Sequence, residues 1–169
     1  DLFIEYFNQH PEVKLIIAPH VIDENHLVEI IRKLKRPYVR YTRADEKNVR
    51  KADCLIIDCF GLLSSIYRYG EIAYIGGGFG GGIHNTLEAA VYGIPVIFGP
   101  KYQKFQEAIR LLEAKGGFSI KSYEELKALL DRMLEDEEFL RESGMNAGLY
   151  VTDNAGATDK VLNLSLIHI

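Results

Sequence analysis

The chain has 169 residues, and 47% of them are hydrophobic, which is enough for a single domain with a core of its own. Its formal charge is −4 and it has no basic stripe of the kind that binds nucleic acid, so the sequence argues against a nucleic-acid partner. It contains no apolar run of about 18 residues, so we predict no membrane-spanning segment within it.

The order of the predicted elements indicates the fold class. The first residues have the pattern of a helix that is already under way, and we expect the chain to be a piece of a longer protein. Short β-rich runs then alternate with helical patterns, and several runs are apolar on both faces, as buried parallel strands are. We predict strands at residues 14–18, 38–42, 54–58, 72–76, 95–99 and 117–120. The alternation predicts an α/β fold, a Rossmann-like parallel sheet with helices on both faces.

The charge and the end of the chain bear on its organisation. Eight acids and four bases lie between Lys121 and Glu142, a balance that equals the whole net charge and is typical of a solvated helix face. The end, LNLSLIHI, abandons the preceding polar pattern, so we expect residues 164–169 to be a non-native tail. No linker divides the remainder, and we predict one domain over residues 1–163.

The two cysteines flank an apolar run within the third predicted strand. As strand residues, Cys54 and Cys59 would have their sulfurs roughly 16 Å apart and on opposite faces. They are therefore not expected to pair with each other, and a reduced, cytosolic compartment is the simple interpretation.

Loops at the carboxyl ends of parallel strands are where α/β sheets bind ligands. That rule selects the loops at residues 19–23, 58–63, 76–85 and 99–104. Asp58 closes the third strand and precedes a glycine and a new helix, so it is a candidate ligand contact, with a loop brace as the structural alternative. His20 has only its position in its favour.

The third of these loops contains an unusual glycine run, with six glycines among residues 76–82. The run formally contains G-x-G-x-x-G, but the next strand ends without the acid that an NAD site needs, and no Gly-Lys-Ser/Thr follows for a P-loop. Bare amides that lead into a helix expected to begin near His84 suit a phosphate or a carboxylate. The structural alternative is a tight strand-to-helix connection with close packing.

Polar residues follow the glycines on the predicted helix. His84 and Glu88 are four residues apart and would share a face of its first turn. Asn85 and Glu88 also have the spacing of a capping box, with Asn85 as N-cap, and this alternative stays open. In the functional interpretation Glu88 accepts hydrogen bonds from the vicinal hydroxyls of a ribose, and His84 donates to a phosphate or sugar oxygen.

The string GGGFGGGIHNTLEAAVYGIPVIFGPKYQKFQEA strongly resembles the C-terminal half of the 3-deoxy-D-manno-octulosonic acid (Kdo) transferases, which are GT-B glycosyltransferases. The resemblance covers most of residues 12–150. The matching motifs are Pro19-His20, Asp58-x-x-Gly61-x-Leu63, Gly76-Gly77, Gly82-x-His84-Asn85-x-x-Glu88-Ala89 and Gly99-Pro100 with Phe105 and Glu107.

The resemblance implies an enzyme of lipopolysaccharide biosynthesis that moves Kdo from CMP-Kdo to a lipid A precursor, without a metal or a cofactor. It implies that this chain holds the sugar nucleotide. The acceptor site, a carboxylate general base and a membrane anchor would belong to an N-terminal domain that is absent from the printed sequence, so no catalytic residue is expected here. The implied location is the cytoplasmic face of the bacterial inner membrane.

Carried over residue by residue, the resemblance implies a donor site made of Pro19, His20, Asp58, Gly61, Leu62, Leu63, Gly77, Gly78, His84, Asn85 and Glu88. Glu88 would hold the ribose hydroxyls, Asn85 and the amides of residues 61–63 would meet the phosphate, and Pro19-His20 would lie near the base. Many family members have an arginine at the position of His20. A histidine is charged only when its pKa permits, so Arg43, Lys101 or Lys104 is expected to compensate.

Two alternatives from the residues stay open. One is another GT-B enzyme that uses a sugar nucleotide, such as a UDP-sugar transferase or epimerase. The other is a non-catalytic nucleotide-binding module in which the glycines serve turns only. An NAD-dependent oxidoreductase is weakened by the missing acid.

Overall fold

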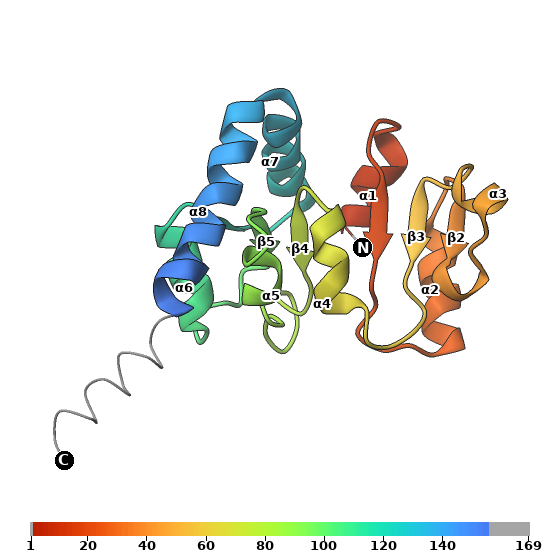
Figure 1. Cartoon of the computed structure of the whole chain (residues 1–169), viewed down its shortest axis with the longest axis horizontal. Coiled ribbons are helices and arrows are strands. Elements are labelled where there is room, and N and C mark those ends of the chain that lie inside the picture. Colours follow the sequence, from red (N-terminus) through yellow and green to blue (C-terminus); the bar gives the residue numbers. More distant parts are fainter. Residues whose placement is uncertain (1, 156–169) are drawn as a thin grey trace, which may run out of the picture. The chain divides into compact units, whose positions relative to one another are not determined.

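The computed structural model describes residues 2–155, which form two compact units divided between Ile66 and Tyr67 (Figure 1). Each unit is described by itself. The expectation of one donor-binding domain over 1–163 stays a prediction, and the proposed tail at 164–169 lies outside the described residues.

The first unit is a three-stranded parallel sheet with helices. In chain order its elements are α1 (Leu2–Gln9), β1 (Leu15–Ile17), α2 (Glu24–Lys33), β2 (Tyr38–Arg40), the 3₁₀ helix η1 (Tyr41–Arg43), α3 (Glu46–Val49), β3 (Cys54–Ile56) and α4 (Leu63–Ile66). The strand order is β1-β3-β2, so β3 lies between its two neighbours (Figure 1). The core consists of Ile4, Phe7, Leu27, Ile30, Cys54 and Ile56.

Local sequence signals explain the helix that follows β1. The Asp23 carboxylate accepts hydrogen bonds from the amides of Asn25, at 2.9 Å, and His26, at 3.1 Å, and so caps the N-terminus of α2. Leu27 and Ile30, three residues apart, are the buried residues of this helix. The helix therefore begins where its cap lies and packs through one apolar face.

The second unit repeats the parallel arrangement. Its elements are η2 (Tyr67–Tyr69), β4 (Ala73–Ile75), α5 (Leu87–Ala90), β5 (Val96–Phe98), α6 (Gln106–Glu113), β6 (Gly117–Ser119), α7 (Tyr123–Glu135) and α8 (Glu137–Ala155). The strand order is β4-β5-β6, and all three residues of the central strand β5 are fully buried. Helices α7 and α8 lie side by side (Figure 1).

The structure confirms the α/β class and all six predicted strands, each one or two residues shorter than predicted. The helix expected to begin near His84 was predicted wrongly in its extent, because α5 has only four residues and begins at Leu87. Both cysteines are free, and burial raises the pKa of Cys54 to about 12. None of the helices within residues 2–155 combines the length and the apolar composition that a membrane span requires.

Candidate functional site

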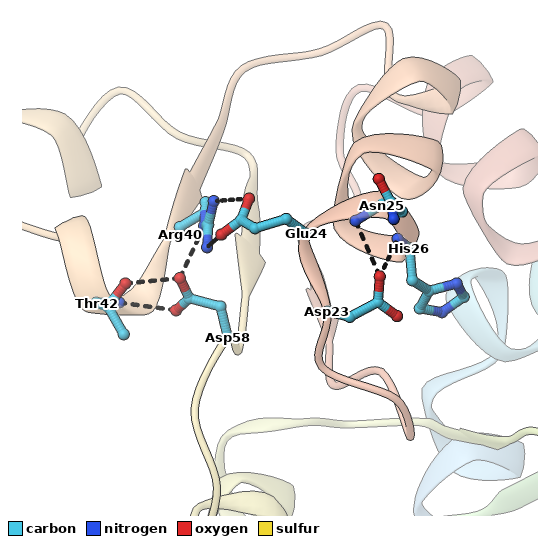
Figure 2. Close-up of polar contacts among 7 residues, drawn as sticks. All are labelled: Asp23, Glu24, Asn25, His26, Arg40, Thr42 and Asp58. Carbon is cyan, nitrogen blue, oxygen red and sulfur yellow. Dashed lines mark hydrogen bonds and ion pairs between the residues drawn. The ribbon is translucent and has the colours of Figure 1, made fainter.

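In the first unit, the ends of β2 and β3 carry a network of charged side chains. The ladder pairs Arg40 with Ile56, the last residues of β2 and β3, so Thr42 and Asp58 each lie two residues beyond the ends of these neighbouring strands. The Asp58 carboxylate accepts from Arg40 Nε at 2.7 Å, from the Thr42 amide at 2.9 Å and from the Thr42 hydroxyl at 2.6 Å (Figure 2). The strand register therefore brings these groups together.

The Asp58 side chain is only 1% exposed, yet it is ionised. Burial alone would raise the pKa of this carboxyl, but hydrogen bonds from the Thr42 hydroxyl and amide and from Arg40 outweigh it and lower the pKa to about 2. Three hydrogen bonds, from Arg40 and Thr42, hold this carboxylate against the end of β2. This geometry is that of a loop brace, and the predicted contact of Asp58 with a ligand stays a prediction.

Replacing Asp58 by asparagine is expected to reduce the free energy of unfolding at pH 7 by about 2 kcal/mol. This is the free energy that corresponds to lowering the pKa of the carboxyl from 3.8 to about 2. Because the folded pKa lies below the unfolded one, this stabilisation is complete above about pH 4 and is lost as the pH falls towards 2. Urea unfolding of wild type and variant at several pH values from 7 to 3 measures it. A difference as large at pH 3 as at pH 7 would contradict the assigned pKa.

Glu24 extends this network outward. Arg40 Nη1 and Nη2 donate to the two carboxylate oxygens of Glu24, at 3.0 Å and 2.7 Å (Figure 2). The hydrogen bonds to Glu24 and then to Asp58 raise the pKa of Arg40, and the bond from Arg40 lowers the pKa of Glu24. The charge of Arg43 also favours ionised Glu24. Arg43 thus takes part in the electrostatics of this edge, and its compensation for His20 stays a prediction.

The other predicted site residues of this unit lie in two loops. Pro19 and His20 follow β1, where Pro19 is half-buried and His20 is exposed. Gly61, Leu62 and Leu63 lie beyond β3, and Leu63 is the first residue of α4. Since β1 and β3 are neighbours in a parallel sheet, both loops leave the same edge. The predicted placement of these residues at strand ends is confirmed.

In the second unit, several glycines of the run 76–82 are required by contacts within the chain. Gly77 has φ +88°, and a Cβ there would overlap the carbonyl oxygen of Gly82. A Cβ on Gly78 would lie 2.6 Å from the amide nitrogen of Gly99, and one on Gly82 would lie 2.8 Å from the Phe105 ring. The structural alternative of close packing is therefore correct for Gly77, Gly78 and Gly82.

Two other glycines of the run have room where a side chain would lie. A Cβ added to Gly81 would meet nothing within 4 Å, and one added to Gly80 would make only an ordinary contact of 3.7 Å. Lys101 holds this turn, since its amide donates to the Gly78 carbonyl at 2.9 Å and its Nζ donates to the Gly80 carbonyl at 3.1 Å. Contacts within the chain thus explain glycine at Gly77 and Gly78, whereas the Cβ side of Gly81 is open, and ligand clearance by the run stays a prediction.

Asn85 and Glu88 contact each other, but not as the predicted capping box. Thr86, not Asn85, is the N-cap residue of α5. The Asn85 side chain accepts from the Leu87 amide at 3.0 Å and donates through Nδ2 to Glu88 Oε1 at 3.0 Å. These two bonds fix the orientation of the Asn85 amide, which in turn positions the carboxylate of Glu88.

His84 precedes α5, so the expectation that it shares a helical turn with Glu88 is wrong. Its amide donates to the Gly76 carbonyl at 3.2 Å, and a Cβ on Gly77 would lie 3.4 Å from His84 Nε2. The imidazole therefore lies beside the glycine turn. Burial and then the charge of Glu88 raise the pKa of Tyr67, which adds a phenol to the surroundings of Glu88.

Sequence reasoning missed Glu24, Arg40, Thr42 and Tyr67. A signal for Arg40 was present, because it is a cation at the end of an otherwise apolar strand and a half-buried arginine needs carboxylate partners. Glu24 and Thr42 carried no signal of their own. Within residues 2–155 no group of three or more His, Cys, Asp or Glu side chains is placed to hold a metal ion.

Comparisons with known proteins define the class. The fold resembles the C-terminal CMP-Kdo binding domain of WaaA from Acinetobacter baumannii, with a TM-score of 0.72 and 20% identity over 86% of this chain and 77% of that one. The fold is thus that of the C-terminal domains of GT-B glycosyltransferases. No family model matches the chain.

Two curated sequence relatives carry the same name. The 3-deoxy-D-manno-octulosonic acid transferase of Aquifex aeolicus is 35% identical over 134 residues, which are 78% of this chain and 36% of the relative. The enzyme of the same name from Rickettsia bellii is 33% identical over 115 residues, 66% of this chain and 28% of the relative. The chain is a relative of the Kdo transferases, as its motifs predicted, and it spans about a third of their length.

Proposed function

We propose that this chain is the donor-binding part of a glycosyltransferase that moves Kdo from CMP-Kdo to a lipid A precursor. The observation that carries the proposal is the 35% identity with the Aquifex aeolicus transferase over 134 residues, a match shared with relatives of the same name. The Acinetobacter baumannii domain of the same fold is described as CMP-Kdo binding, which supports the same donor for this chain.

Glu88 is the proposed partner of the ribose. Its Oε1 accepts from Asn85, while Oε2 makes no hydrogen bond to the described part of the chain. A half-buried carboxylate held in one orientation offers acceptor positions at a fixed spacing, which suits two vicinal hydroxyls. Asn85 Nδ2 carries a second N–H, which is available to a phosphate oxygen.

Residues 61–63 are the proposed phosphate contact of the first unit. Gly61 is exposed, has φ +87°, and a Cβ on it would meet nothing within 4 Å, so a ligand can approach its backbone closely. When CMP departs, negative charge grows on its phosphate, and amides held in place stabilise that charge without reorganising. Removal of one such donor typically costs about 3 kcal/mol of barrier.

The remaining chemistry is proposed to lie outside this chain. Sugar transfer also needs a base that takes the proton of the acceptor hydroxyl. We assign that base, the lipid A precursor and the attachment to the cytoplasmic face of the inner membrane to the preceding domain of the full enzyme. The chain alone is therefore expected to bind CMP and to show no transferase activity.

Calorimetric titration tests this proposal. We expect wild type to bind CMP more tightly than UMP or UDP, and Glu88→Gln to weaken CMP binding about tenfold, because a charge-assisted acceptor for the ribose is lost. Removing the 2′-hydroxyl should act on the same contact, so 2′-deoxy-CMP should bind wild type and the variant almost equally. Glu113→Gln, an exposed change on α6, is the control.

The outcomes separate the proposal from its alternatives. Absence of CMP binding to wild type would overturn the donor assignment, and a preference for UDP would favour a UDP-sugar enzyme. Unchanged CMP affinity in Glu88→Gln would remove the ribose role of Glu88. Turnover by the chain alone would contradict the assignment of the base to another domain.

A further inference from the structure

Arg40 holds carboxylates from two loops with one guanidinium group. We propose that Arg40 and Glu24 are positioning residues that fix the loops after β1 and β3 in the shape that binds the donor. This inference rests on the proposed function, and it assigns to these two residues an effect on binding that acts through the loops they hold.

The first loop is anchored at its far end. The loop after β1 contains Pro19 and His20 and ends at Asp23, which caps α2. Glu24, the first residue of α2, accepts from both terminal nitrogens of Arg40, at 3.0 Å and 2.7 Å (Figure 2). Two parallel bonds define a direction as well as a distance, so they fix where the first turn of α2 lies relative to β2.

The second loop is anchored at its start. Asp58 leaves β3 with a side chain that is 1% exposed and receives Arg40 Nε at 2.7 Å. Beyond it the chain emerges into solvent, since Phe60 is 82% exposed and Gly61 has no close neighbour on its Cβ side. The direction in which the amides of residues 61–63 point is therefore set largely at Asp58.

Only an arginine can make this connection. Its three nitrogens serve two acceptors in one plane, whereas a lysine has a single nitrogen that cannot reach both carboxylates with the same geometry. The partner Glu24 is 69% exposed, and exposed ion pairs contribute little to stability. A pair that adds little stability but defines the position of two loops is better explained by a role in shaping a site.

Glu24→Gln tests the inference, with Glu29→Gln as a matched control. Both residues lie on α2, with side chains that are 69% and 67% exposed, and both substitutions remove one negative charge. We expect Glu24→Gln to weaken CMP binding about tenfold with an unchanged urea midpoint, and Glu29→Gln to change neither. An effect of charge alone would change the CMP affinity in the opposite direction, because removing a negative side chain should strengthen the binding of a phosphate.

Amide NMR spectra of the protein without ligand provide a second readout. Glu24→Gln should move the resonances of residues 61–63, which lie far from position 24 in sequence, and Glu29→Gln should leave them in place. Arg40→Lys keeps the charge but not the planar set of donors. It should therefore also shift the resonances of residues 61–63 and weaken CMP binding relative to wild type.

The results distinguish the inference from the function on which it rests. If wild type does not bind CMP, the proposed function is wrong. If wild type binds CMP and Glu24→Gln binds it equally well or more tightly, the positioning role is wrong and the donor assignment stands. Unchanged resonances of residues 61–63 in Glu24→Gln would also overturn the positioning role.

Discussion

Replacing Arg36 by alanine is expected to destabilise the first unit by about 3–5 kcal/mol, since it removes a half-buried guanidinium that donates to four backbone carbonyls. The Arg36 side chain is 12% exposed, stacks on the Phe7 ring with 4.1 Å to its centroid, and lies 3.3 Å from a carboxylate oxygen of Asp53. Its terminal nitrogens donate to the backbone carbonyls of Phe7, His10, Pro11 and Val13, at 2.8–3.0 Å.

The reason for so large an effect is that these carbonyls end α1 and the turn after it. The last carbonyls of a helix have no partner within the helix, and Arg36 satisfies several acceptors in this region at once. Without the guanidinium, the carbonyls of Pro11 and Val13 must take water or lose their bonds, while those of Phe7 and His10 each keep one backbone donor. Among the described residues, Asp53 then keeps Lys14 as its ion-pair partner. The helix and the strand that follows it would both loosen.

Urea denaturation followed by circular dichroism measures this change, because the chain contains no tryptophan. Lys35→Ala is the matched control, since it removes the same charge from the adjacent, exposed position. Arg36→Lys should retain little of the lost stability, because one ammonium cannot span four carbonyls. Equal midpoints for Arg36→Ala and Lys35→Ala would show that the carbonyl contacts contribute nothing.

The strands were predictable because their signal is local. Apolar β-branched runs bounded by glycine, proline and polar residues indicate buried strands, and all six are present. The C-terminal ends of these strands were predicted one or two residues too far along the chain, because the β-rich sequence pattern continues past the last residue paired in the ladder. Thr42 and Asp58 lie beyond β2 and β3, where their side chains bond across the sheet edge instead.

The side-chain network at that edge was not predictable for a different reason. Arg40 meets partners 16 and 18 residues away, and Arg36 meets carbonyls 23 to 29 residues away, so the pairing depends on which strands become neighbours. The contact of Asn85 with Glu88 was anticipated from spacing, but its form was not. The Asn85 side chain accepts a hydrogen bond from the nearby Leu87 amide. Such local bonds of asparagine compete with helix formation, and α5 begins only at Leu87.

Alanine substitutions within the glycine run are expected to divide its members by role. Gly77→Ala should cost at least about 2 kcal/mol of unfolding free energy, because its φ of +88° disfavours any side chain and the new Cβ would overlap the Gly82 carbonyl. Gly81→Ala should change stability by no more than about 0.5 kcal/mol, since its Cβ would meet nothing within 4 Å and its φ is not left-handed.

The same pair of variants, titrated with CMP, distinguishes packing from ligand clearance. If the open side of Gly81 receives the donor, Gly81→Ala will weaken CMP binding while its urea midpoint stays that of wild type. If the glycines serve packing only, Gly81→Ala will match wild type in both measurements, and the loss will be confined to Gly77→Ala. A stable Gly77→Ala variant would contradict the close approach of Gly77 to Gly82. We thus expect glycine to be required for two different reasons within five residues of the run. At Gly77 the reason is a backbone contact, and at Gly81 it is space for a ligand.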